Sequence, residues 1–378
     1  MIGSHCTRPW RVPSIPTELA DTNPRLANRI ESSPYGLFRF VNRSFADEVC
    51  ARFERRAGPT VNLHGDAHIE QYAVTVTGRG RADFDDAARG PAAIDLVRMT
   101  TSLALSCRAN GFQCESILGA FYEGYRIALE APIAKLARPG FAKKARATFL
   151  RDRRAVFAER EALFEPLKDS ERFDNILIHY RRQIMRRHPE LPPAFFEPKR
   201  VGRLRIGVGS ALDEKYLVRI EGPSPGSDDD LFLELKEVRD LSGIRCLSPT
   251  GLGSPLRVLR GQERIAYQPY QLAGYVLLSS HDHAQRGANA FWVHEWADNY
   301  VEAAHDGFDR PDALAELARD VGVQLGLGHP RNWKPEVAAD VRRALLRWFD
   351  DERDRIESLG IELAETLETT WTRRGSLP

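Results

Sequence analysis

Residues 61–74 read VNLHGDAHIEQYAV, and residues 82–96 read ADFDDAARGPAAIDL. The first stretch places the carboxylate of Asp66 just after a short apolar run, and the amide of Gln71 follows five residues later. The second stretch begins with Asp83 and carries further acids behind it. Carboxylate and amide oxygens are hard ligands of the kind that hold magnesium beside phosphates. The two stretches together therefore favour phosphoryl transfer.

A purely structural interpretation of the same residues stays open. Gly65 and Asp66 are typical of a tight turn, and Asp83 and Asp85 are typical of residues that cap a following helix. For one acidic pair alone, this interpretation would be preferred. The occurrence of two acid-bearing stretches so close together weakens it, and we expect Gln71, Asp83 and Asp85 to be the metal-binding residues.

The clearest sheet signal lies in the second half of the chain. Three short runs rich in alternating or β-branched residues predict an antiparallel meander: RLRIGVGS (203–210), KYLVRIEG (215–222) and LFLELKEV (231–238). In the first run, Gly207 and Gly209 would let backbone N–H groups approach a phosphate, and Ser210 would add a hydroxyl donor. These glycines are also typical of ordinary turns.

Lys236 strengthens the phosphate interpretation of the meander. Side chains alternate along a strand, so Phe232, Glu234 and Lys236 share one face, and the intervening leucines share the other. A lysine among such apolar neighbours is unexpected unless an anion pairs with it, and a phosphate would do so. A lysine on an edge strand facing water is the alternative.

The remaining sequence predicts mostly helix. Helical spacing marks residues 44–57, with Ser44 as the expected N-cap, and residues 95–109, 116–131 and 143–167. A helix broken near Pro269, two strands at 275–280 and 288–296, and helices from Asp312 onward follow. No internal repeat is evident.

Composition excludes several classes of protein. The 378 residues suffice for two domains or one two-lobed enzyme, and 54 basic residues nearly balance 53 acidic ones. This balance gives no reason to expect a nucleic-acid or membrane-surface partner. No secretory signal or membrane span is evident, so a cytoplasmic protein is expected. The cysteines contain no CxxC pair and are expected to be buried thiols: Cys6, Cys50, Cys107, Cys114 and Cys246.

HGDAHIEQ followed by ADFDDAARGPAAIDL resembles the catalytic and metal-binding loops of the protein-kinase-like superfamily, especially its aminoglycoside and choline kinase branch. The RIGVGS and LFLELKEV segments resemble that superfamily's Gly-rich hairpin and lysine strand. The two blocks also resemble an uncharacterised bacterial family of unknown function within it. The resemblance covers roughly residues 35–330.

This resemblance implies an α+β, two-lobed, protein-kinase-like fold with a small antiparallel-sheet lobe and a larger helical lobe. Because the catalytic loop precedes the lysine strand here, it also implies a circular permutation, which surface termini tolerate. The segment LARDVGVQLGLGHPRN (317–332) resembles the helix that leads into the catalytic loop. The expected divisions are an N-terminal extension, the helical lobe, the sheet lobe and C-terminal helices: 1–60, 61–199, 200–300 and 301–378.

The resemblance also implies roles for single residues, with ATP and magnesium as cofactors. Asp66 would orient the attacking hydroxyl or accept its proton, and Asp83 would bind magnesium. Lys236 would hold the α- and β-phosphates. Glu263, on the helix after the lysine strand, is the expected partner of Lys236, because Glu237 should point to the opposite face.

Other residues of the motif would form its scaffold. His64 would pack the catalytic loop, and Asp95 would cap backbone N–H groups there. His68 has a family counterpart, although a loop histidine is more often an ordinary polar contact. Gln71 departs from the family, which has Asn five residues after the catalytic Asp.

Two further functions therefore stay open beside phosphotransfer from ATP to a hydroxyl of a small molecule or protein. A nucleotide-binding regulator without turnover would explain Gln71. A metal-dependent phosphoesterase would use His64, Asp66, His68 and Asp83 as ligands, but it leaves the glycine hairpin and Lys236 unexplained. The acceptor has no signature in the sequence.

Overall fold

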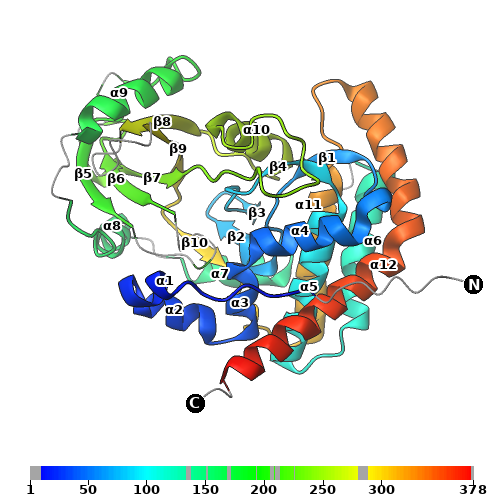
Figure 1. The fold of residues 1–378 in the computed structure, drawn as a ribbon. Helices are drawn as coiled ribbons and strands as arrows, with labels where there is room; N and C mark the ends of the chain where they lie inside the picture. The colour runs from blue at the N-terminus through cyan, green and yellow to red at the C-terminus, as the bar shows by residue number, and fades with distance from the viewer. Residues whose placement is uncertain are drawn as a thin grey trace, which may run out of the picture.

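In the residues that it describes, the computed structural model has an α+β fold in which helices and three antiparallel sheets share one chain (Figure 1). It describes residues 10–132, 138–149, 152–167, 172–192, 194–204, 208, 213–224, 226–279 and 288–375. The largest sheet lies on one side of the molecule, and the long helices lie on the other (Figure 1). The two smaller sheets lie between them.

The largest sheet has five antiparallel strands in the order β5-β6-β7-β9-β8. Their bounds are β5 Pro198–Arg203, β6 Lys215–Ile220, β7 Leu231–Glu237, β8 Gly274–Ser279 and β9 Ala288–Trp296. The second and third runs of the predicted meander and the two later strands are thus confirmed. The first run, expected at 203–210, is not: β5 ends at Arg203, and most of 205–210 lies outside the described residues. Leu233 and Leu235 on β7 pack against apolar residues of α9 Arg172–Met185. Lys236 lies on the other face, as the alternation predicts.

The helical side is built on close contact between α6 Glu115–Glu130 and α11 Pro311–Gly328. A Cβ atom at Gly322 would lie 2.1 Å from the backbone oxygen of Phe121, so only glycine allows this approach. Two further helices, α5 Ala93–Asn110 and α12 Pro335–Gly375, pack against each other along the same core. The predicted helices at 95–109, at 116–131 and after Asp312 are confirmed.

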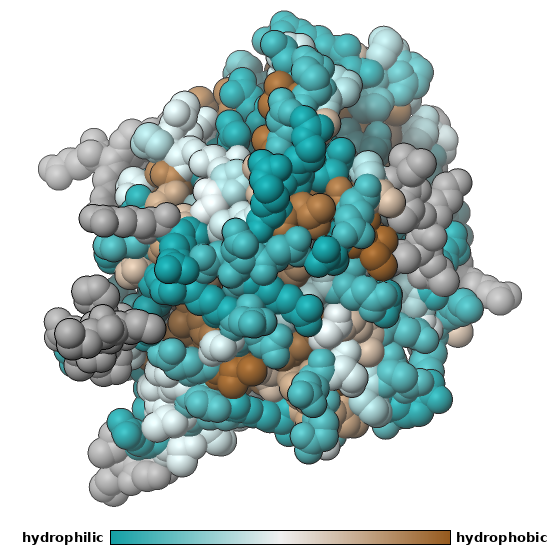
Figure 2. All heavy atoms as spheres, turned by 90° about the vertical axis from the view of Figure 1, so that its right-hand side faces the viewer, coloured by the Kyte–Doolittle hydropathy of each residue, from teal (hydrophilic) through white to brown (hydrophobic). Residues whose placement is uncertain are grey.

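Helix α12 forms one edge of the molecule (Figure 1). Its buried residues recur at helical spacing: Leu345, Phe349, Ile356, Leu363 and Leu367. Figure 2 views this edge and shows mainly hydrophilic side chains with small apolar patches. The helix is therefore amphipathic, with one stripe in the core and the rest in water.

Four short helices open the described chain: α1 Thr17–Thr22, α2 Pro24–Glu31, α3 Pro34–Phe40 and α4 Asn42–Phe53. The helix expected at 44–57 is α4 followed by the 3-10 turn η1 Glu54–Arg56. Ser44 does not cap it, because α4 begins two residues earlier and the Ser44 hydroxyl accepts a hydrogen bond from the indole of Trp10. The helical stretch expected at 143–167 contains two helices, α7 Gly140–Ala147 and α8 Arg153–Glu161.

The two small sheets bring distant segments together. One pairs β1 Thr60–Leu63 with β4 Ala88–Pro91, and the other has the order β10-β2-β3. The strands of the second are β10 Tyr300–Glu302, β2 Tyr72–Thr75 and β3 Arg79–Arg81. Helix α10 Pro255–Ile265 ends four residues before Pro269, which agrees with the predicted break. The motif-bearing loops thus lie between elements that are far apart in sequence.

The expectation of buried free thiols is wrong for four cysteines. Cys50 of α4 forms a disulfide with Cys246, and Cys107 of α5 forms one with Cys114. The first pair is separated by 196 residues, so no local spacing such as CxxC could have revealed it. It joins the N-terminal helices to the chain that follows the lysine strand.

Within the described ranges, no helix has both the length and the apolar character needed to cross a membrane.

Candidate functional site

The first motif forms a loop that begins at the end of β1. Pairing of β1 with β4 holds this loop against Asp86, and a Cβ atom at Gly65 would lie 2.0 Å from the Asp86 backbone oxygen. Gly65 also has a φ of 81°, which favours glycine. The loop conformation therefore depends on this residue.

Asp95, in the first turn of α5, fixes the loop backbone. Its carboxylate accepts hydrogen bonds from the backbone N–H groups of His64 at 2.7 Å and Gly65 at 2.9 Å. Nε2 of His329, which follows α11, lies 3.1 Å from the same carboxylate. The predicted capping role of Asp95 is confirmed.

His64 packs inside the loop, as expected. Its Nε2 lies 2.9 Å from the backbone oxygen of Ala82, and its Nδ1 accepts the backbone N–H of Asp66 at 3.3 Å. Burial, with Arg81 nearby, lowers the pKa of His64 to about 3, so its ring is neutral. Because both ring nitrogens are engaged, His64 is not available as a metal ligand.

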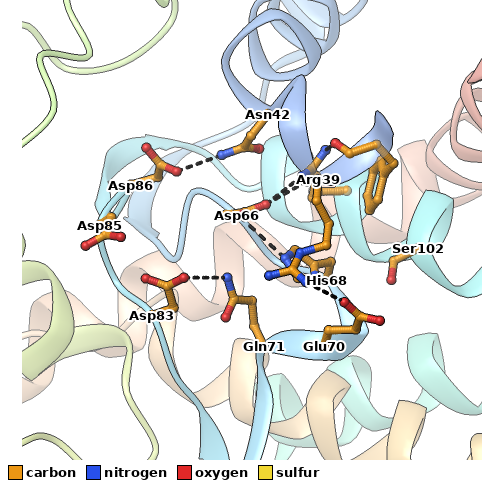
Figure 3. Close-up of polar contacts among 12 residues, drawn as sticks. Arg39, Asn42, Asp66, His68, Glu70, Gln71, Asp83, Asp85, Asp86 and Ser102 are labelled. Atoms are coloured by element: carbon orange, nitrogen blue, oxygen red, sulfur yellow. Dashed lines mark hydrogen bonds and ion pairs between the residues drawn. The ribbon is translucent and has the colours of Figure 1, made fainter. Parts of the chain in front are cut away.

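Asp66 lies almost entirely in the interior. Nε of Arg98 donates to its Oδ1 at 2.9 Å, and Nη2 of Arg98 lies 2.7 Å from the same oxygen. Nε2 of His68 lies 3.5 Å from the other oxygen (Figure 3). Burial opposes ionisation of Asp66, but the Arg98 charge outweighs it and holds the pKa of Asp66 well below its usual range. Asp66 is therefore ionised at neutral pH and weakly basic.

Arg98 contacts the candidate site, although the sequence motifs did not point to it. It is fully buried on α5, its guanidinium lies 3.7 Å from the ring centre of Phe38, and Nη1 donates to the Phe38 backbone oxygen at 3.0 Å. A lone arginine inside the apolar run 93–107 was a usable signal, because a buried cation requires an anionic partner.

Lys236 meets the second motif. Its ammonium forms ion pairs with Oδ1 of Asp83 and, at 2.5 Å, with Oδ2 of Asp85. Oδ1 of Asp85 accepts a 2.6 Å hydrogen bond from the indole of Trp292 on β9. The strand face predicted for Lys236 thus meets the acids predicted for the early loop, although 153 residues separate Lys236 from Asp83.

The two acids respond differently to this environment. Burial would raise the pKa of Asp83, but Lys236 outweighs burial and lowers it. Burial and the neighbouring Asp83 charge raise the pKa of Asp85 to about 7. Gln71 joins the group, because its Nε2 donates to Oδ2 of Asp83 at 3.2 Å (Figure 3). Gln71, Asp83 and Asp85 therefore form one cluster.

Glu263 does not join Lys236. Its side chain is exposed on α10, whereas the carboxylates that act on the Lys236 charge are those of Asp83, Asp85 and Glu234. The helical position correctly predicted an element near the sheet, but not the direction of the side chain. Gly207, Gly209 and Ser210 lie outside the described residues.

A cavity of about 610 Å³ lies between the five-stranded sheet and the β10-β2-β3 sheet. Its lining includes Lys215, Glu234 and Lys236 from the first and Arg81 and Tyr300 from the second. Asp83 lines it as well, whereas Asp66 lies deeper and is 5% exposed. The cavity is within the size range of small-ligand sites.

The N-terminal helices also reach this region, which the sequence did not suggest. Asn42 of α4 donates to the Gly65 backbone oxygen at 3.0 Å and to Asp86 at 2.9 Å. The hydroxyl of Tyr35 lies 3.4 Å from Nδ1 of His68. Arg39 of α3 donates to Glu70 at 2.7 Å (Figure 3). No local sequence pattern links these residues, because the contacts span 23 to 44 positions.

The donor set can be compared with what magnesium requires. In the described part of the chain, no three His, Cys, Asp or Glu side chains are arranged to hold a metal ion. Asp83 and Asp85 offer hard carboxylate oxygens, and Gln71, beside Asp83, carries an amide oxygen. This set fits magnesium held mainly by phosphates and water with one or two protein ligands. It does not fit the transition-metal centre of the phosphoesterase alternative, because His64 is engaged elsewhere.

Comparison with known families agrees with part of the sequence-based expectation. Residues 22–138 match the model of a family described as an uncharacterised protein conserved in bacteria (DUF2252). No curated protein and no solved structure matches the chain. The matched range contains both acid-bearing loops and the N-terminal helices that contact them.

Proposed function

We propose that this protein is an ATP- and magnesium-dependent phosphotransferase with a circularly permuted, two-lobed, protein-kinase-like fold. The observation that carries the proposal is the contact of Lys236 with Asp83 and Asp85 at the edge of the 610 Å³ cavity. A lysine from a sheet and carboxylates from a separate loop are the pairing that a nucleotide triphosphate and its metal ion require.

The order of elements also supports the proposal. The lysine strand β7 is followed by α10 and then by β8 and β9, which complete its sheet. The loop with Asp66 and Asp83 lies among the helices. In this interpretation residues 200–300 form the core of the nucleotide-binding lobe, on which α8 and α9 pack (Figure 1). The rest of residues 61–199, together with 301–378, forms the helical lobe. Such a site needs its lysine and its carboxylates to lie close together in space, and a changed order of the elements along the chain does not prevent this.

The chain's own residues would act mainly by positioning charge. Lys236 would bind phosphate oxygens from the sheet side. Asp66 would orient the acceptor hydroxyl, whose oxygen forms the new bond to the γ-phosphorus as the bond to the leaving ADP oxygen breaks. The hydroxyl proton would pass late in the step to Asp66 or to an oxygen of the transferred phosphoryl group. Magnesium, held by Asp83 with Asp85 or Gln71, would neutralise phosphate charge. Because Arg98 makes Asp66 weakly basic, orientation of the hydroxyl matters more than strong proton abstraction.

The ion pair between Asp66 and Arg98 favours a second candidate function. A catalytic carboxylate held by a buried arginine, together with Gln in the Asn position, suits a protein that binds nucleotide without turnover. Measurable phosphotransfer or ATP hydrolysis would exclude this regulator.

The proposal is tested by incubating purified protein with γ-labelled ATP, magnesium and cell extract and following transfer of the label. This assay presumes neither a small-molecule nor a protein acceptor. Asp83→Ala should abolish turnover while the protein stays folded, and Asp350→Ala, which removes a half-exposed carboxylate on α12, should leave turnover unchanged. Full turnover by Asp83→Ala would contradict the assignment.

A further inference from the structure

Arg39 approaches the candidate site from the N-terminal helices, on the side away from the five-stranded sheet. It lies in the last turn of α3, lines the same cavity as Asp83 and Lys236, and its side chain is 16% exposed. Figure 3 shows it beside Asp66, His68 and Glu70. Several cations line this cavity, including Lys215 and Lys236 from the five-stranded sheet and Arg81 from the smaller sheet, and Arg39 adds one from α3, which precedes both motifs in the chain.

Other contacts hold Arg39 in place. Its Nη1 donates to Oε2 of Glu70 at 2.7 Å, and Oε1 of Glu70 lies 2.7 Å from Nδ1 of His305. The ring of His305 stacks on Tyr35, with ring centres 4.0 Å apart. A side chain held in this way loses little conformational freedom when a ligand binds.

Arg39 still has hydrogen-bonding capacity. Its Nε is buried and has no hydrogen-bond partner among the described residues. A buried N–H group without a partner is costly, and a ligand oxygen would remove that cost. Burial alone would lower the pKa of Arg39, but the carboxylates of Glu70 and Glu302, with a smaller contribution from Asp66, outweigh it and keep the guanidinium charged. Figure 3 shows Arg39 beside Asp66, the residue that would orient the acceptor.

We infer that Arg39 binds the terminal phosphate of a nucleoside triphosphate from the Asp66 side of the cavity, opposite Lys236. The inference rests on the proposed function. The γ-phosphate is the group that must lie next to Asp66, so a cation on that side contacts it rather than the α- or β-phosphate. A guanidinium is suited to this contact, because its planar N–H groups can pair with two phosphate oxygens.

Titration calorimetry with magnesium tests the inference by comparing ADP with a non-hydrolysable ATP analogue that has nitrogen between the β- and γ-phosphates. Arg39→Ala should weaken binding of the analogue about 10- to 100-fold, the value of a charge-assisted hydrogen bond, and should change ADP binding less than about twofold. Arg39→Lys keeps the charge and should show a smaller loss in the same direction. It also serves if the alanine variant fails to fold.

Arg126 provides the matched control. It lies on α6, is not among the residues that line the cavity, and pairs with Glu130 and Asp350, so Arg126→Ala should leave the preference for the triphosphate unchanged. An unchanged preference in both Arg39 variants, or equal weakening of ADP and the analogue, would overturn the inference while leaving the proposed function intact. Failure of the unmodified protein to bind either nucleotide would instead remove the proposed function, and the inference with it.

Discussion

The guanidinium of Arg98 lies 2.7 Å from Oδ1 of Asp66, and both side chains are buried. This ion pair connects the core of α5 to the loop that carries the proposed acceptor-orienting group. Because neither charge is in contact with bulk water, each depends on the other. The pair accounts for the position of Asp66 and for its low pKa.

Arg98→Met should therefore destabilise the protein by about 3–5 kcal/mol, because it leaves a buried carboxylate without its cation. Urea unfolding at neutral pH measures this loss. Arg126→Met is the matched control, since Arg126 is half-exposed and pairs with Glu130 and Asp350 at the surface. We expect the control to change stability by about 0–1 kcal/mol. Equal effects of the two substitutions would contradict a dominant role for the buried pair.

The difference in the free energy of unfolding between the wild type and Arg98→Met should also depend on pH. The folded-state pKa of Asp66 is depressed, so the stabilisation from its ion pair is complete above the unfolded carboxyl pKa of about 3.9. It is lost as the pH falls below that value. We expect the free energies of unfolding of the two proteins, measured from pH 7 down to the lowest pH at which both fold, to approach each other as the pH falls. Curves that stay parallel throughout would count against the ion pair.

Asp85 should have the opposite pH dependence. Its pKa in the folded protein is raised to about 7 by burial and by Asp83, so the folded state holds a proton that the unfolded state releases above about pH 4. Relative to Asp85→Asn, the wild type should lose stability as the pH rises from about 4 to about 7 and then level off. Asp47→Asn is the control of opposite sign, because Arg245 lowers the pKa of Asp47. If the stability difference between the wild type and Asp85→Asn did not change between pH 4 and about 7, the pKa of Asp85 would not be raised in the folded protein.

Short-range geometry correctly predicted two features of the candidate site, the strand face of Lys236 and the cap formed by Asp95. Alternation along β7 separates Lys236 from Leu233 and Leu235 because a strand repeats every two residues, whatever its tertiary surroundings. The cap formed by Asp95 was also predictable, since a carboxylate beside exposed N–H groups of a loop has few other roles. These features depend on short-range geometry, which the sequence encodes directly.

The parts that were missed depend on contacts between distant segments. Arg39, Tyr35 and Asn42 reach the loop only because α3 and α4 pack against α5, and nothing in their own spacing indicates this. The direction of Glu263 was missed because a helix that is correctly placed can still turn any of its faces to the sheet. Side chains that act through tertiary packing need coordinates.

The corrected position of Glu263 leads to a binding prediction. Lys236→Ala should abolish the stabilisation by ATP and magnesium in a thermal-shift assay, because the phosphates lose their sheet-side cation. Glu263→Ala should leave that stabilisation unchanged, because its side chain is exposed and is not among the carboxylates that act on Lys236. If Glu263→Ala weakened the ligand effect as much as Lys236→Ala, the original pairing would be restored.

The disulfide between Cys50 and Cys246 should contribute substantially to stability, because it closes a segment of 196 residues between α4 and the chain after β7. An ion pair lies beside this disulfide in the sequence: Nη2 of Arg245 is 2.6 Å from Oδ2 of Asp47. In the chain-entropy model, removing this pair by Cys50→Ala with Cys246→Ala should cost about 5 kcal/mol, against about 2 kcal/mol for the seven-residue pair Cys107 and Cys114.

Urea unfolding of the two double variants measures this contrast, and adding a reductant to the wild type provides an independent check. Reduction should lower the unfolding midpoint of the wild type towards that of the variant that lacks Cys50 and Cys246. A wild-type midpoint that does not respond to reductant would mean that these thiols are free. In that case the chain after β7 would be held to α4 only by noncovalent contacts such as Asp47 with Arg245.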